Sequence, residues 1–254
     1  MDFTKAIVRQ PGRSIVSGLS ESSLELPVYE KALEQHHLYV QALQGCGLDV
    51  TVLDPLEHYP DSTFVEDVAV LTPECAIITA PGAPSRAAEI DAIKGTLEKI
   101  FPRIASIISP GTLEGGDVMQ VGTHYYIGLS ARTNQEGARQ LIAILEKYGM
   151  TGSTIPVHNF LHLKTGVTWV GNKTLVAESG FSGGVDLMNY NTIQVEKDER
   201  GAANCIYLSN NIIMPAGYTK TKQRLAATEA TIVEVDISEY AKIDGGLTCL
   251  SLRF

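Results

Sequence analysis

The segment D-V-M-Q-V at residues 117–121 is followed, after a short turn, by Y-Y-I-G at 125–128. Short apolar runs bounded by turn residues predict β-strands. The same pairing of strands occurs five times along the sequence. Each pair begins at a residue that we call the head of its repeat: Asp67, Asp117, Gly166, Asn204 and Cys249. The heads lie 50, 49, 38 and 45 residues apart. A repeat of this length predicts an array or a propeller, and in a propeller equivalent positions meet at the axis.

The fifth repeat is completed from the other end of the sequence. C-L-S-L-R at 249–253 has no second strand after it, and A-I-V-R at 6–9 supplies one. Because a ring closed in this way cannot be cut into independent halves, we predict one domain over residues 1–254. Helical periodicity predicts helices between the strands at 28–44, 85–101, 133–148 and 219–228, with a weaker connector at 181–190. A Thr133–Glu136 capping box would open the third helix. Short extra strands are predicted at 50–53 and 232–235. The predicted fold class is α/β, with five mixed blades around a central channel.

The overall composition excludes several classes of protein. The net charge of -9 disfavours a nucleic-acid-binding surface, which requires clustered Lys and Arg. No apolar run approaches the length that spans a bilayer, and the first ten residues lack the apolar core of a signal peptide. The four cysteines lack C-x-x-C spacing. We therefore expect a cytoplasmic protein with reduced thiols, no membrane association and no nucleic-acid partner.

Cys249 is the leading candidate for a nucleophile. A cysteine beside an apolar strand is more often an inert small hydrophobe, but Cys249 is the head of its repeat and follows two glycines in G-G-L-T-C. His162, in F-L-H-L-K-T-G, lies four residues before the head Gly166. A thiol nucleophile needs a base, and the ring axis would bring the two together. No His-x-x-x-His or paired-cysteine spacing is present, so we predict no metal site.

Two acidic pairs occupy equivalent positions in the first two repeats. Glu66 and Asp67 lie in F-V-E-D, and Glu114 and Asp117 lie in L-E-G-G-D. Acidic residues beside a strand are usually caps or turn residues, but pairs that recur at equivalent positions point to the axis. Convergent carboxylates suit a cationic substrate, and a guanidinium matches a carboxylate bidentately.

Two other stretches admit a functional interpretation. G-F-S-G-G at 180–184 fits G-x-S-x-G, but no histidine follows His162 as the order of an esterase triad requires, so we reject this site. The stretch 10–27 is rich in Gly, Ser and Pro. It fits a lid over a binding site as well as it fits an unspecialised surface connection.

The motifs F-V-E-D, L-E-G-G-D, H-L-K-T-G and G-G-L-T-C-L-S-L occur in this order and resemble those of the guanidine-modifying enzymes of the pentein superfamily. Within that superfamily the sequence resembles the dimethylarginine dimethylaminohydrolases over nearly its whole length. The resemblance implies a five-bladed ββαβ propeller around a central active-site channel, no cofactor and a small guanidine amino acid as substrate. It implies a hydrolase that converts asymmetric dimethylarginine or monomethylarginine to citrulline and dimethylamine or methylamine. A homodimer is also expected from the family.

The resemblance further implies a role for each matching residue. Cys249 would attack the guanidinium carbon to form an S-alkylthiouronium. His162 would protonate the departing amine and then activate water, and Glu114 would orient His162. The implied substrate contacts are the main chains of Leu19 and Ile243, Asp61 at the α-amino group, Phe64 along the aliphatic stem, Glu66 and Asp67 at the guanidinium, and Arg86 and Arg132 at the carboxylate.

Three alternative functions stay open at this point. The same residues would suit the deimination of unmethylated arginine or a related guanidine. Transfer of the amidino group to an amine would need a second substrate site, which the sequence does not indicate. A non-catalytic propeller, such as the ribosome-binding factor of this fold, would have no need for Cys249, His162 and Glu114 together.

Overall fold

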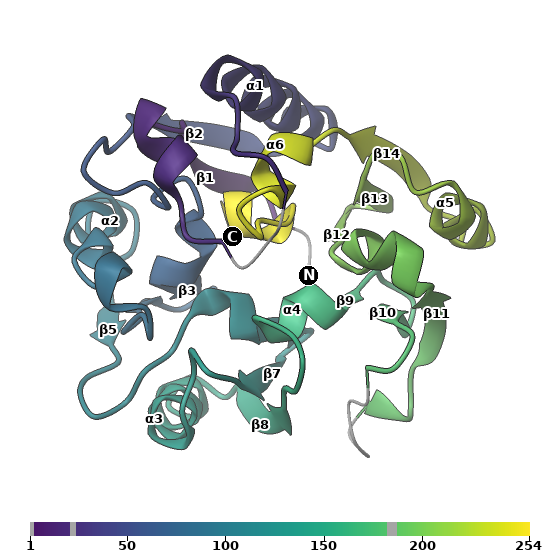
Figure 1. The fold of residues 1–254 in the computed structure, drawn as a ribbon. Coiled ribbons are helices and arrows are strands. Elements are labelled where there is room, and N and C mark those ends of the chain that lie inside the picture. The colour runs from purple at the N-terminus through teal and green to yellow at the C-terminus, as the bar shows by residue number, and fades with distance from the viewer. Residues whose placement is uncertain (1–2, 21–23, 182–186) are drawn as a thin grey trace.

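The computed structural model describes residues 3–20, 24–181 and 187–254. Within these residues five three-stranded sheets stand around an axis (Figure 1). In four of them the first two strands are antiparallel and the third is parallel to the second. In chain order these four sheets are β3 (Ala69–Leu71), β4 (Ala76–Ile78) and β5 (Ile104–Ser106); β6 (Val118–Val121), β7 (His124–Leu129) and β8 (Thr151–Pro156); β9 (Val167–Trp169), β10 (Thr174–Glu178) and β11 (Asn191–Val195); and β12 (Ile206–Leu208), β13 (Asn211–Pro215) and β14 (Thr231–Val235).

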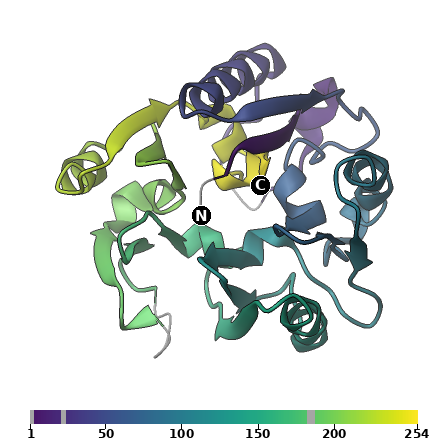
Figure 2. The ribbon, with the colours of Figure 1, turned by 180° about the vertical axis from the view of Figure 1, so that it is seen from behind.

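The fifth sheet joins the two ends of the sequence. Strand β1 (Lys5–Arg9) lies between β15 (Leu252–Arg253), to which it is antiparallel, and β2 (Asp49–Leu53), to which it is parallel. Ile7 stands opposite Leu252 in this pairing. Seen from behind, the closing sheet completes the ring (Figure 2). The predicted closure of the ring and the predicted five-bladed α/β fold are therefore confirmed.

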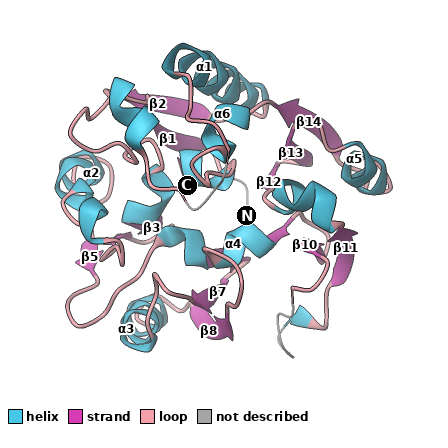
Figure 3. Ribbon diagram, in the orientation of Figure 1, coloured by secondary structure: helices cyan, strands magenta, loops and turns pink. Residues whose placement is uncertain are grey.

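Four helices connect the second and third strands of their sheets and lie on the outside of the ring (Figures 1 and 3). They are α1 (Tyr29–Gly45), α2 (Glu89–Leu97), α3 (Gln135–Glu146) and α5 (Thr219–Leu225). The helix predicted at 85–101 is shorter than expected, because a separate 3₁₀ turn occupies Pro84–Arg86. Two further helices, α4 (Leu163–Gly166) and α6 (Ser238–Ala241), have only four residues each. No helix of the described ranges has the length and apolar character needed to cross a membrane.

Helix α3 begins differently from the prediction. Its N-cap is Asn134, whose side chain accepts a hydrogen bond from the Gly137 amide at 2.8 Å, so the predicted Thr133–Glu136 capping box is wrong. The Thr133 hydroxyl instead accepts from the Glu114 amide at 3.1 Å. The apolar face of α3 buries Leu141 and Leu145 completely, which stabilises the blade by roughly 1.5–3 kcal/mol for each side chain.

The heads of the repeats lie in or beside short helical turns that precede the first strand of each sheet. Three of their side chains accept a backbone amide from the turn of the following repeat, each at 2.9 Å, and we call these bonds head contacts. The three head contacts run from Gly116 N to Asp67 Oδ1, from Leu163 N to Asp117 Oδ1 and from Thr248 N to Asn204 Oδ1. Head contacts therefore tie neighbouring blades together beside the axis.

Carboxylates also fix the described part of the irregular stretch 10–27. Glu57 accepts the amides of Arg13 and Ser14 at 2.9 and 3.1 Å, at the start of a 3₁₀ turn over Arg13–Ser17. Asp61 accepts the amide of Leu19 at 2.9 Å. Residues 21–23 lie outside the described residues, as does most of the G-x-S-x-G sequence at 180–184.

Candidate active site

A small pocket of about 40 Å³ opens at the axis of the ring, and it gathers side chains from several blades. Ten of the eleven residues predicted for the site line it. These are Leu19, Asp61, Phe64, Asp67, Arg86, Glu114, Arg132, His162, Ile243 and Cys249. The pocket also includes Leu161, Asp244 and Gly245, which the sequence analysis did not assign. Leu161 adjoins His162 and Asp244 adjoins Ile243, whereas Gly245 is the first of the two glycines that precede Cys249 in G-G-L-T-C.

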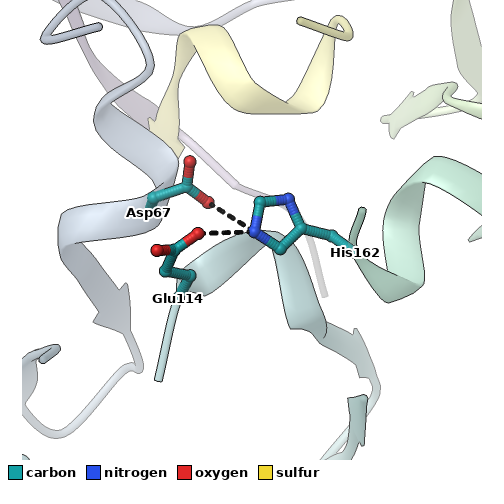
Figure 4. Close-up of side chains that lie close together, drawn as sticks. All are labelled: Asp67, Glu114 and His162. Carbon is teal, nitrogen blue, oxygen red and sulfur yellow. Dashed lines mark hydrogen bonds and ion pairs between the residues drawn. The ribbon is translucent and has the colours of Figure 1, made fainter. Parts of the chain in front are cut away.

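The imidazole of His162 faces two carboxylates (Figure 4). Its Nε2 atom lies 2.7 Å from Glu114 Oε2 and 4.0 Å from Asp67 Oδ1. His162 is 5% exposed, and burial alone would lower its pKa. The negative charges of Asp67, Glu114 and Asp117 outweigh burial and raise the pKa of His162 to about 9. At neutral pH the ring is therefore an imidazolium, which can donate a proton.

Glu114 is held from three sides. Its Oε1 accepts the Ala83 amide at 3.0 Å and lies 3.6 Å from Arg132 Nη1, while its backbone amide donates to Thr133. Its Oε2 is the atom that meets His162. The carboxylate is 1% exposed, so each of these contacts acts with little solvent screening. The sequence folds this way because Glu114 sits just before the 3₁₀ turn Gly115–Asp117 that opens β6.

Gly116 explains why the L-E-G-G-D motif needs a residue without a side chain. A Cβ atom at this position would lie 2.7 Å from Cγ of His162 and 2.9 Å from Asp67 Oδ1. The backbone of Gly116 thus lies directly against the imidazole, and its amide donates to Asp67. The closeness of ring, backbone and carboxylate fixes the plane of His162.

Asp67 is also bonded to the guanidinium of Arg86. Arg86 Nη1 lies 2.5 Å from Asp67 Oδ2, and the other nitrogens donate to Glu89 and to the carbonyl oxygens of Asp61 and Phe64. Burial would raise the pKa of Asp67, but the positive charges of His162 and Arg86 lower it. Arg86 lines the pocket as predicted, yet its bonds in this structure hold Asp67, and its contact with a substrate carboxylate stays a prediction.

Cys249 lies in the 3₁₀ turn Thr248–Leu250, and its Sγ accepts the amide of Gly246 at 3.5 Å. Burial and the nearby charges of Glu66 and Asp67 raise the pKa of this thiol to about 12. The resting side chain is therefore a thiol rather than a thiolate. The other three cysteines are buried away from this pocket, and all four are free.

The location of Glu66 differs from the prediction, because Glu66 does not line the pocket with the other ten residues. Its carboxylate pairs with Lys164 at 2.5 Å and with Arg253 at 3.0 Å, and it accepts the Thr248 hydroxyl at 2.8 Å. These four residues line a separate cavity of about 130 Å³. Successive residues of the short turn Val65–Val68 point in different directions, so Glu66 and its neighbour Asp67 reach different cavities.

The cluster of Asp67, Glu114 and His162 has ligand atoms within 4.8 Å of one another, so it could also hold a metal ion. The prediction of no metal rested on sequence spacing, which cannot detect ligands drawn from three blades. In this structure the three groups bond to each other, to Arg86 and to backbone amides, as an acid–base cluster does.

Comparison with known proteins agrees with this arrangement. A model of the family described as N,N dimethylarginine dimethylhydrolase, eukaryotic, matches residues 20–181. The N(G),N(G)-dimethylarginine dimethylaminohydrolase of Pseudomonas aeruginosa is 49% identical over 253 residues, covering 99% of this chain and 100% of that protein. The protein of the same name from Streptomyces coelicolor is 35% identical over 254 residues, covering 100% of this chain and 98% of that protein.

Solved structures show the same fold. A Cys-to-Ser variant of the Pseudomonas aeruginosa enzyme, complexed with citrulline, superposes with a TM-score of 0.98 at 49% identity, covering 100% of both chains. The N-terminal domain of a cyanobacterial arginine dihydrolase has a TM-score of 0.89 at 18% identity, covering 98% of this chain and 97% of that one, which shows a shared fold alone. The five-sheet ring and its axial pocket thus define a guanidine-modifying enzyme of the pentein class. Within that class, the chain belongs to the dimethylarginine dimethylaminohydrolase family.

Proposed function

We propose that this protein hydrolyses asymmetric dimethylarginine and monomethylarginine to citrulline and dimethylamine or methylamine. One observation carries the proposal: a single axial pocket gathers the thiol of Cys249, the protonated imidazole of His162 and the carboxylates of Asp67 and Glu114. The carboxylates supply the negative charge that a guanidinium requires, and the thiol and imidazole supply a nucleophile and a proton donor.

The reaction begins with attack of the Cys249 sulfur on the guanidinium carbon. Asp67 and Glu114 fix the guanidinium plane, so that the sulfur approaches from above it. His162 donates its proton to the methylated nitrogen, which leaves as a neutral amine, and the enzyme retains an S-alkylthiouronium. The resulting neutral imidazole then takes a proton from water. The hydroxide attacks the same carbon, the C–S bond breaks, and citrulline and the thiol form.

The thiol must lose its proton to solvent before this attack, because His162 is already protonated, although the pKa of the thiol lies at about 12 in this structure. The positive charge of a bound guanidinium opposes the charges of Glu66 and Asp67, which contribute to the raised pKa of Cys249. Binding of the substrate therefore promotes formation of the nucleophile. Near neutral pH the thiolate therefore forms mainly when a substrate is bound.

The remaining pocket residues suit the amino-acid end of the substrate. The side chain of Arg132 is 21% exposed and lies beside Glu114, so it can pair with the substrate carboxylate. Arg86 would contribute positive charge to this pairing from a more buried position. The α-amino group of the substrate donates hydrogen bonds to the Asp61 carboxylate and to the carbonyl oxygens of Leu19 and Ile243. Phe64 packs along the aliphatic stem. We assign Glu66 to holding the Thr248 turn rather than to the substrate.

Deimination of unmethylated arginine is the second candidate, because the same thiol, imidazole and carboxylates would perform it. Its fold-level support is the likeness to the cyanobacterial arginine dihydrolase. The proposal also treats residues 1–254 as one domain, acting in the cytoplasm as a homodimer without a cofactor. Sedimentation of the purified protein tests the dimer.

A product assay tests the function. Asymmetric dimethylarginine and arginine are supplied in parallel to the wild type and to the Cys249→Ser variant. We expect citrulline and dimethylamine from the methylated substrate, and no product from the variant. Citrulline and ammonia from arginine alone would favour a deiminase. If the wild type released no citrulline from any guanidine, the catalytic proposal would be wrong.

A further inference from the structure

We infer that Asn204 is a positioning residue that fixes the location of the nucleophile Cys249 relative to the acid–base residue His162. This inference rests on the proposed function and extends it to a residue outside the pocket. Asn204 is the head of the fourth repeat, and the residue is 6% exposed. It does not line the pocket that contains Cys249 and His162.

The side chain of Asn204 makes three hydrogen bonds to two catalytic segments. Its Oδ1 accepts the Thr248 amide at 2.9 Å, and its Nδ2 donates to the Lys164 carbonyl at 2.9 Å and to the Thr248 hydroxyl at 3.0 Å. Thr248 adjoins Cys249 in the chain, and Lys164 follows His162 by two residues. One amide thus bridges the segment of the nucleophile and the segment of the proton donor.

Glu66 determines the direction of the bond between Asn204 and the Thr248 hydroxyl. The Thr248 hydroxyl donates to the Glu66 carboxylate at 2.8 Å, which accepts only, so the hydroxyl must receive its other bond from the Asn204 amide. A carboxylate at position 204 would lose both donors and would bring a second negative charge toward Glu66. This explains why the head is neutral here, whereas Asp67 and Asp117 serve the earlier head contacts.

The segment from Gly246 to Cys249 packs closely against Asn204, so its backbone has little room to move. A Cβ atom on Gly246 would lie 2.6 Å from Cγ of Asn204, so the backbone of the turn rests on the amide. The Cys249 amide bonds to Gly246 O at 3.2 Å, and Cys249 Sγ accepts the Gly246 amide. Displacement of Gly246 would therefore move the sulfur directly.

Removal of the amide should consequently impair chemistry more than binding. The substrate contacts proposed above do not include Asn204, so KM depends little on it. A misplacement of about 1 Å between reacting groups can reduce a rate by about 100-fold. We expect kcat of Asn204→Ala for dimethylarginine to fall by about 10- to 100-fold, with KM within about twofold of the wild type.

The experiment measures kcat and KM for the wild type, Asn204→Ala, Asn204→Asp and Thr248→Ser. Thr248→Ser retains the amide and the hydroxyl that Asn204 binds, so we expect it to retain most of kcat. Thr221→Val is the control, because Thr221 is a fully buried polar residue that bonds to Glu199 far from the pocket. It should lower the unfolding temperature without lowering kcat.

The outcomes separate this inference from the proposed function. An inactive wild type would contradict the function itself. An active wild type with Asn204→Ala kcat within twofold, or with a rise in KM instead of a fall in kcat, would contradict the positioning role. The positioning role would also be contradicted if Asn204→Ala and Thr221→Val lowered the unfolding temperature equally and Asn204→Ala lost no more kcat than Thr221→Val. If Asn204→Ala does not fold, Asn204→Asp and Thr248→Val test the same bonds by the same criteria.

Discussion

His162 Nε2 and Glu114 Oε2 lie 2.7 Å apart, although 48 residues separate the two in the sequence. The contact crosses from one blade to the next and is closed to solvent on both sides. It gives the imidazole a fixed orientation and, with Asp67 and Asp117, a raised pKa. The pair therefore sets both the direction and the pH range of proton donation.

The first prediction concerns the pH dependence of kcat. His162 acts as an acid only while protonated, so activity should be lost as the pH rises through about 9. Glu114→Gln removes one of the charges that raise this pKa, and the alkaline limb should move to lower pH. Asp67 and Asp117 keep part of the effect. Glu136→Gln, in an exposed pair with Arg139, should leave the limb unchanged. An unmoved limb in Glu114→Gln would contradict the assignment.

The second prediction concerns the thiol of Cys249. Alkylation by neutral iodoacetamide should be slow at pH 7 and should accelerate throughout the range up to about 12, because the resting pKa is raised. A bound guanidinium analogue should lower the pH at which thiolate absorbance appears. Cys249→Ser provides the baseline, since the three remaining cysteines are buried. If the thiol titrates at the same pH with and without the analogue, activation by the substrate is excluded.

The third prediction concerns Gly116. In Gly116→Ala the new methyl group would meet the imidazole, so His162 must turn or the β6 turn must move. We expect kcat to fall by about 100-fold and the free energy of unfolding to fall by about 1–3 kcal/mol. Gly95→Ala is the matched control, since nothing lies within 4 Å of its Cβ in helix α2. It should stabilise the protein by roughly 0.5–1 kcal/mol and leave kcat alone. Equal effects at both positions would refute the packing argument.

The fourth prediction separates the two arginines. Arg86→Leu leaves Asp67 and Glu89 buried without their cation, so it should cost about 3–5 kcal/mol of stability and reduce kcat. Arg132→Leu, at a partly exposed site, should leave stability nearly unchanged. It should raise KM for dimethylarginine about tenfold or more, but not for a guanidine that lacks a carboxylate. Chemical denaturation and steady-state kinetics measure both. Indistinguishable variants would contradict the division of roles.

The repeat in the sequence predicted the ring. The four motifs contain five of the ten predicted residues that line the pocket, and the family resemblance supplied the other five. Three features of the structure could not be predicted from the sequence. The placement of Glu66 depends on how a single 3₁₀ turn directs adjacent side chains, and no periodicity describes one turn. The bonds of Arg86 depend on Glu89, which starts helix α2 and had no motif of its own. The cap of α3 moved by one residue because Thr133 is engaged by Glu114. In each case contacts between distant segments decided the outcome.

The closing sheet makes the position of the nucleophile depend on residues far from it in the sequence. Strand β15, three residues beyond Cys249, is held in place by β1 from the opposite end of the sequence. The turn that carries the nucleophile is thus anchored only when segments from opposite ends of the ring pair. We expect a variant that lacks β15 to lose most of its activity, because Cys249 would lose this anchor.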